Sequence, residues 1–150
     1  MRIVLVRHAD AVSEGPGLPD EHRYLSPAGR QQSRELGALL AESGVVVGAA
    51  VASPLVRAVQ TGELVLAAIG WGGALEASAR LAPGSSTRAT ASWLEERAAK
   101  LDGALVVVGH EPSISALAEL LGGGERVSAF HKAEAALVED GTLKWRLAAR

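Results

Sequence analysis

The sequence predicts a three-layer α/β/α sandwich with a mixed, mostly parallel sheet, built as a single domain over residues 1–150. Short runs of Val, Leu, Ile and Ala alternate with longer helical segments, the pattern of strands joined by crossover helices. Near the C-terminus, two apolar segments (127–138 and 143–147) flank Glu139-Asp140-Gly141-Thr142, a strong hairpin signal. The 150 residues have the length of one ordinary domain, and the sequence contains no repeat or linker.

The expected strands are short and strongly apolar. Residues 3–6 form a continuous run of β-branched residues and leucine, which is typical of a strand covered on both faces. Residues 45–52 and 104–108 have the same character, and residues 75–81 predict a further short strand.

The expected helices follow these strands. The first begins at Ser26-Pro27 and is stopped by Gly44, and the second begins at Ser53-Pro54 and runs to about residue 69. In both, serine is the expected N-cap and proline occupies the first helical position. Two further helices are expected, over residues 87–101 and 113–121.

Composition excludes several classes of function. Fifteen Lys and Arg against seventeen Asp and Glu give a net charge of −2, which argues against a broad nucleic-acid-binding surface. The chain has no cysteine, so it has no disulfide, thiolate zinc site or cysteine nucleophile. Its uncharged stretches are shorter than a membrane span requires, and its N-terminal apolar run is too short for a signal peptide. We therefore expect a cytoplasmic protein with no membrane partner.

Four polar side chains stand where the expected strands end. Arg7-His8 closes the first strand, Arg57 follows the second and His110 closes the third. The carboxyl ends of parallel strands form one edge of the sheet, where ligands bind and helix N-termini favour anions. Guanidinium groups bind phosphate oxygens in a bidentate manner, and a neutral imidazole can attack phosphorus. The pattern therefore predicts phosphoryl chemistry.

The segments around these residues resemble the motifs of the histidine phosphatase superfamily, which includes the phosphoglycerate mutases. The matching segments are residues 5–9, 53–61 and 107–112. Residues 25–29 and 81–84 also resemble segments of the short SixA-type phosphohistidine phosphatases. The resemblance implies a phosphoglycerate mutase-like fold. The stretch between the second and third motifs is too short for the insertions that cap the pocket in the mutases.

The resemblance also implies roles for individual residues. His8 would be the nucleophile, and Arg7, Arg57 and His110 would bind the phosphoryl oxygens. No metal or other cofactor is implied, because the arginines neutralise the phosphoryl charge. His110 would stay protonated if it contacts the phosphate. Arginine charges near His8 are expected to keep its imidazole neutral.

Other side chains are weaker candidates. Glu111 occupies the position of the general acid of the acid phosphatases, yet it could equally stabilise the start of a helix. Asp10 and Ser13 could line the pocket, whereas His22 and His131 match no motif and are expected to be structural or solvated.

Three functions remain open at this point. The first is hydrolysis of phosphohistidine on a protein, such as a histidine-containing phosphotransfer domain. The second is hydrolysis of a small phosphate ester by the same residues. The third is a non-catalytic module that binds phosphate or a metal; Arg7 and Arg57 argue against a metal because their charges would repel a cation.

Overall fold

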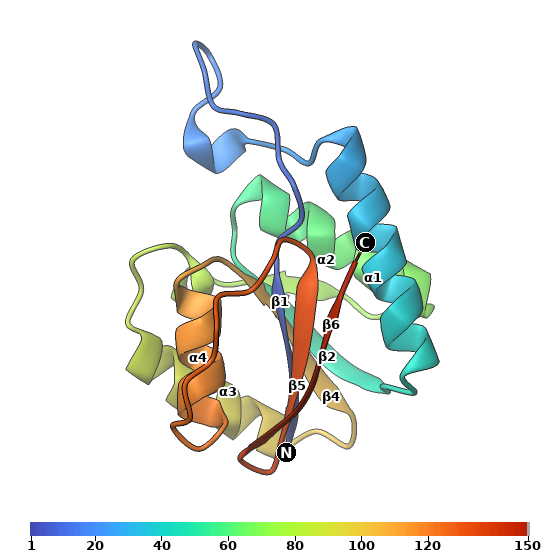
Figure 1. Cartoon of the computed structure of the whole chain (residues 1–150), viewed down its shortest axis with the longest axis vertical. Helices are drawn as coiled ribbons and strands as arrows, with labels where there is room; N and C mark the ends of the chain where they lie inside the picture. Colours follow the sequence, from blue (N-terminus) through green and yellow to red (C-terminus); the bar gives the residue numbers. More distant parts are fainter. Residues whose placement is uncertain (150) are drawn as a thin grey trace.

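A six-stranded mixed sheet lies at the centre of the computed structural model, which describes residues 1–149 (Figure 1). The strand order is β3-β2-β4-β1-β5-β6; the first four strands are parallel, and β5 and β6 are antiparallel to their neighbours. The strands are β1 (Arg2–Arg7), β2 (Val47–Ala52), β3 (Leu75–Ala77), β4 (Ala104–Gly109), β5 (Glu134–Glu139) and β6 (Thr142–Ala148).

Helices cover both faces of the sheet, so the predicted three-layer α/β/α architecture is confirmed (Figure 1). Successive residues of a strand point to opposite faces. In β1, Val4 and Val6 therefore pack with one pair of helices, and Ile3 and Leu5 with the other pair. The first pair is α1 (Pro27–Glu42) and α2 (Val56–Ile69), and the second is α3 (Thr87–Ala99) and α4 (Ser113–Leu121).

The start of α1 follows the sequence prediction. Ser26 is the N-cap and its hydroxyl accepts a hydrogen bond from the N–H of Gly29, with Pro27 as the first helical residue. Gly29 allows the helix to approach the segment after β1, because a Cβ there would lie 1.9 Å from the carbonyl oxygen of Asp10. Glycine at this position therefore lets α1 pack beside the end of β1.

The start of α2 corrects the sequence prediction. The N-cap is Leu55, and no side chain caps the helix. Ser53 instead extends the sheet, donating its N–H to the carbonyl oxygen of Val108 at 2.9 Å. Ser53 is buried beside β4, and its hydroxyl bonds to another side chain, described below, and accepts from the N–H of Leu55 at 3.3 Å.

Two strand predictions were too long. β3 ends at Ala77, and a 3-10 helix over Ala79–Leu81 follows it. β5 begins at Glu134, and the apolar residues before it form a loop in which Phe130 is buried. The predicted hairpin is present, and its turn places Asp140 and Gly141 at φ values of 48° and 78°. Among the described residues, no helix is both long enough and apolar enough to span a membrane.

Candidate active site

The predicted site residues come together at the carboxyl ends of β1, β2 and β4. Arg7 lies beside Gly109 in the parallel pairing of β1 with β4, so the residues that follow, His8 and His110, are neighbours. Their ring centroids are 5.1 Å apart. Arg57 reaches the same place from the first turn of α2.

These side chains line an open cavity of about 380 Å³. The loop of residues 10–25, which projects beyond the sheet at the top of Figure 1, contributes further residues to its wall. The complete lining is Arg7, His8, Ala11, Asp20, Arg23, Arg57, Pro83, His110, Glu111 and Lys132.

The environment of His8 defines which ring nitrogen can react. Nδ1 lies 2.8 Å from the carbonyl oxygen of Ala9. A carbonyl only accepts hydrogen bonds, so Nδ1 carries the hydrogen of the neutral ring and Nε2 keeps its lone pair. The ring is 8% exposed. The neutral ring of His8 therefore has an unprotonated Nε2, and the hydrogen bond to the backbone fixes the orientation of the ring.

The neutral state of His8 is confirmed, with a different principal cause from the one predicted. The pKa of His8 is lowered to about 4. Burial is the largest cause, the hydrogen bond to the Ala9 carbonyl opposes it, and the charges of Arg57 and Arg7 contribute to the lowering. Burial in the wall of the cavity is thus the largest effect, and the arginines reinforce it.

The two arginines are oriented by bonds at one edge of each guanidinium group. Arg7 donates from Nη1 to the carbonyl oxygen of Phe130 at 2.8 Å. Arg57, only 5% exposed, donates from Nη1 to the carbonyl oxygen of Asp20 at 2.7 Å and from Nη2 to its carboxylate at 3.2 Å. Within residues 1–149, the buried Nε atoms of Arg7 and Arg57 have no hydrogen-bond partner. Donors of this kind suit a tetrahedral oxyanion.

His110 is held from β2. Its Nε2 is hydrogen-bonded to Ser53 Oγ at 2.7 Å, and its buried Nδ1 has no partner among the described residues. The pKa of His110 is lowered to about 3, chiefly by burial and also by the charges of His8 and Arg57. His110 is therefore neutral in this structure. Whether it becomes protonated against a phosphate, as the sequence analysis predicts, stays a prediction.

The second motif also supports the segment after the nucleophile. Thr61 lies one turn after Arg57 in α2 and donates from Oγ1 to the Arg57 carbonyl at 2.7 Å. The same oxygen accepts from the N–H of Ala9 at 3.0 Å. Thr61 thus links the helix that carries Arg57 to the backbone beside His8.

Glu111 lies in the wall of the cavity, and each of its carboxylate oxygens accepts a hydrogen bond from a backbone N–H. Oε1 accepts from the N–H of Ser115 at 2.8 Å, and Oε2 accepts from the N–H of Phe130 at 3.2 Å. From the sequence, Glu111 has two possible roles, a general acid or a residue that stabilises a helix start. The hydrogen bond to Ser115, in the first turn of α4, fits the second role.

Asp10 and Ser13 do not belong to the cavity lining. Asp10 instead bonds to Ser26 and to Lys132, at 2.6 and 2.8 Å. His22 and His131 are exposed, as the sequence analysis expects, and neither belongs to the lining.

Sequence reasoning missed the lining residues Asp20, Arg23 and Lys132. Asp20 bridges two arginines, because its other carboxylate oxygen accepts from Arg23 Nε at 3.0 Å. No motif marks these three residues, since Asp20 lies in a 3-10 helix over Asp20–His22 and Arg23 and Lys132 lie in loops. The only available signal was the high density of charged residues in the segment after His8.

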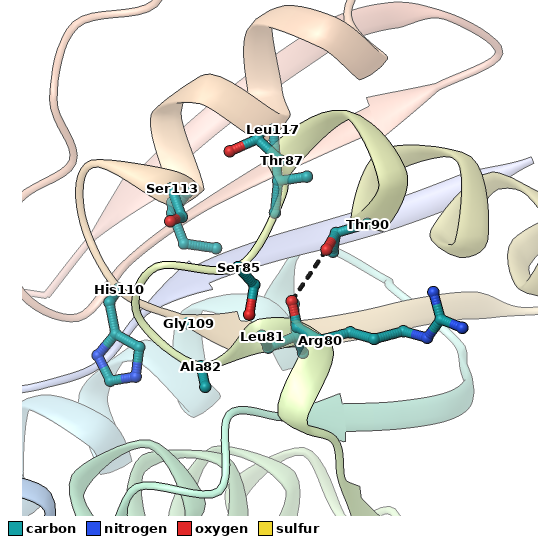
Figure 2. A pocket seen from close by; sticks show the side chains of 11 residues that line it. Arg80, Leu81, Ala82, Ser85, Thr87, Thr90, Gly109, His110, Ser113 and Leu117 are labelled. Atoms are coloured by element: carbon teal, nitrogen blue, oxygen red, sulfur yellow. Dashed lines mark hydrogen bonds between the residues drawn. The ribbon is translucent and has the colours of Figure 1, made fainter.

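A second cavity borders His110 on the side of α3 and α4 (Figure 2). Its volume is only about 10 Å³, room for about one water molecule. Thr90, at one side of it, donates to the carbonyl oxygen of Arg80 at 2.9 Å (Figure 2). Of the two cavities beside His110, only the larger one therefore has space for a substrate. Among residues 1–149, no group of three His, Cys, Asp or Glu side chains is arranged to hold a metal ion.

The pKa of His8 leads to a prediction for its titration. In an NMR pH titration, the His8 ring signals are expected to keep the neutral pattern down to a midpoint near pH 4, instead of the ordinary 6.5. Between these values the unfolded chain binds a proton that the folded chain does not, so the free energy of unfolding should fall as the pH falls from 6.5 to 4. Loss of the signals in His8→Ala assigns them, and a midpoint near 6.5 would contradict the prediction.

Comparisons with known proteins agree with this geometry. The family model of the histidine phosphatase superfamily (branch 1) matches residues 3–82, which include Arg7, His8 and Arg57. An uncharacterized protein of Picosynechococcus sp. (strain ATCC 27264 / PCC 7002 / PR-6) is 33% identical over 125 residues, or 83% of this chain and 75% of that protein.

Two solved structures show the same fold. The protein histidine phosphatase SixA complexed with tungstate has a TM-score of 0.89 at 24% identity, covering 99% of this chain and 97% of that chain. A mycobacterial glucosyl-3-phosphoglycerate phosphatase has a TM-score of 0.67 at 19% identity, covering 91% of this chain and 88% of that chain. The predicted phosphoglycerate mutase-like fold of the short SixA type is thereby confirmed.

Proposed function

The chain belongs to the histidine phosphatase superfamily, and from this premise we propose that it hydrolyses phosphohistidine on a protein, such as a histidine-containing phosphotransfer domain. The proposal is supported by the arrangement of His8, Arg7, Arg57 and His110 around one cavity. The fold shared with the protein histidine phosphatase SixA supports it further.

The proposed reaction has two steps. His8 Nε2 attacks phosphorus in line, the bond from phosphorus to the substrate imidazole breaks, and the departing imidazole takes a proton from solvent. Water then attacks the phosphohistidine on His8, which releases inorganic phosphate and restores the neutral ring. Arg7, Arg57 and His110 bind the three non-bridging oxygens and stabilise the charge of each transition state.

The single observation that favours phosphohistidine over an ester is the hydrogen bonding of the Glu111 carboxylate to two backbone N–H groups. Both of its carboxylate oxygens already accept backbone N–H bonds, so the described geometry gives no poised proton donor at this position. An alkoxide leaves poorly unless it is protonated as its bond breaks, whereas imidazole leaves readily as a neutral ring. A site without a poised general acid is therefore adequate for phosphohistidine.

A small phosphate ester is the alternative substrate. The cavity of about 380 Å³ has a polar rim that includes Arg23 and Lys132, and such a rim could bind a small molecule. The fold shared with a glucosyl-3-phosphoglycerate phosphatase is consistent with it. A non-catalytic phosphate-binding module is the third reading.

A substrate panel tests the proposal. Turnover of a phosphohistidine protein is compared with turnover of sugar and nucleotide monophosphates, each with and without EDTA. We expect kcat/KM to be highest for the phosphohistidine protein and unchanged by EDTA, because arginines supply the positive charge. A preference for one monophosphate would favour the alternative, and binding without turnover would favour the module. Activity lost in EDTA and restored by zinc or magnesium would indicate a metal site.

Replacement of Glu111 gives a prediction that separates the two enzymatic readings. Glu111→Gln is expected to lower kcat/KM by a similar factor, less than about tenfold, on phosphohistidine and on any alkyl monoester that is turned over, because Glu111 is not poised as a general acid. Loss of a backbone contact affects both substrates alike, so the ratio of the two losses isolates the general-acid contribution. A clearly larger loss on the alkyl monoester would show that Glu111 protonates the alkoxide, which would favour a phosphomonoesterase, whereas equal and large losses would indicate damage to the backbone contacts of Glu111.

A further inference from the structure

The main chain of Phe130 connects two residues of the candidate active site. Its carbonyl oxygen accepts from Arg7 Nη1 at 2.8 Å, and its N–H donates to Glu111 Oε2 at 3.2 Å. The side chain is 1% exposed and packs in the core. A shift of this one residue would therefore turn the guanidinium group of Arg7 relative to the cavity.

Arg146, on the edge strand β6, holds the loop that contains Phe130. Its Nη1 donates to Ser128 Oγ at 2.8 Å, and its Nη2 donates to the carbonyl oxygen of Ala129 at 3.4 Å. Its guanidinium carbon lies 4.5 Å from the centre of the Phe130 ring, a cation–π contact. Three consecutive residues are thus fixed by one side chain.

Arg146 is itself fixed by a buried carboxylate. Glu134, the first residue of β5, is 5% exposed and accepts from Arg146 Nε at 2.6 Å through Oε2. Its Oε1 accepts from the N–H of His131 at 2.7 Å, so Glu134 also binds the far end of the loop. The Arg146 side chain is 24% exposed and that of Glu134 only 7%, so the ion pair is partly buried, and its hydrogen bonds give it a defined geometry.

From these contacts we propose that Arg146 is a positioning residue of the active site. It holds Phe130, and through the Phe130 carbonyl it orients Arg7 for binding of the phosphoryl group. Arg146 does not line the cavity and touches no reacting atom. The inference rests on the proposed function only in assigning phosphoryl binding to the cavity.

The variants must separate positioning from stability. Arg146→Met removes the bonds of Arg146 but leaves Glu134 charged and buried without its partner, which is strongly destabilising. The double variant Glu134→Gln/Arg146→Met removes both charges, and the glutamine side-chain oxygen can still accept from His131. Lys144→Met is the matched control, because Lys144 is an exposed cation on the same strand.

The principal measurement is the affinity for inorganic tungstate, a tetrahedral oxyanion, by calorimetry. We expect the double variant to melt close to the wild type and to bind tungstate about tenfold more weakly, the lower end of what a lost supporting contact costs a metal site. Lys144→Met should bind as the wild type does. Wild-type affinity in the double variant would overturn the role of Arg146 alone. A wild type that binds no oxyanion would instead overturn the proposed function together with this role.

A second readout follows the contact itself. Phe130 is the only phenylalanine of the chain, so selective ¹⁵N-phenylalanine labelling gives one amide signal. Tungstate should shift this signal in the wild type and in Lys144→Met. In the double variant the signal should begin at a different position and respond less. An unchanged signal with an unchanged response would show that Arg146 does not hold Phe130.

Discussion

Replacement of His8 by alanine is expected to abolish turnover on every substrate while leaving the fold intact. The reason is chemical: the proposed reaction forms and breaks its covalent bond at His8 Nε2, and neighbouring His110 is already hydrogen-bonded through its own Nε2. The fold should survive because the lost ring bonds only to the adjacent backbone carbonyl. Circular dichroism and thermal melting check the fold.

The covalent intermediate provides the direct measurement. Brief incubation of the wild type with labelled substrate, followed by quenching, should leave phosphate on His8, labile to acid and stable to alkali. His8→Ala should carry no label, whereas His22→Ala, which alters an exposed histidine outside the cavity, should label as the wild type does. A label on serine, or full activity in His8→Ala, would disprove the mechanism.

Loss of either arginine is expected to have the second largest effect. In the proposed mechanism, Arg7→Ala and Arg57→Ala each remove charge-assisted bonds to the phosphoryl oxygens, and by analogy with oxyanion-hole donors each should cost about 2–4 kcal/mol in the transition state. Turnover should fall roughly a hundredfold or more. The melting temperature should change little, because the partner of Arg57, Asp20, is half-exposed and can be hydrated.

Two further variants make this result specific. Arg57→Lys keeps the positive charge but loses the planar fork that bonds both Asp20 and phosphate, so it should recover only part of the activity. Arg34→Ala, in which an exposed arginine of α1 is removed, should have wild-type turnover. Preserved activity with a large drop in melting temperature would mark Arg7 and Arg57 as structural residues.

The sequence was sufficient to predict the architecture, because apolar periodicity reports directly which residues face the core. The β-branched runs at residues 3–6 and 104–108 lie inside β1 and β4, and the Ser26 cap begins α1. The same periodicity predicted too long a β5. Residues 127–133 are apolar enough for a strand, but side-chain contacts hold them in a loop. Phe130 and Arg146 make those contacts, and they are distant in the sequence.

The convergence of the four candidate residues was also predictable, since strand ends in a parallel sheet lie at one edge. Their hydrogen-bond partners were not. The pairings of Ser53 with His110, Asp20 with Arg57, and Glu111 with Phe130 join residues brought together only by strand order and loop paths.

The sequence by itself determined which chemical groups this protein carries and on which elements they stand, because both depend on local pattern. Only the tertiary structure decided how those groups behave. Burial of His8, more than the arginine charges, keeps its imidazole neutral. The carboxylate of Glu111 accepts hydrogen bonds from two backbone N–H groups. The physical reason is that solvation and hydrogen bonding depend on neighbours in space, and the short-range pattern of a sequence does not contain them.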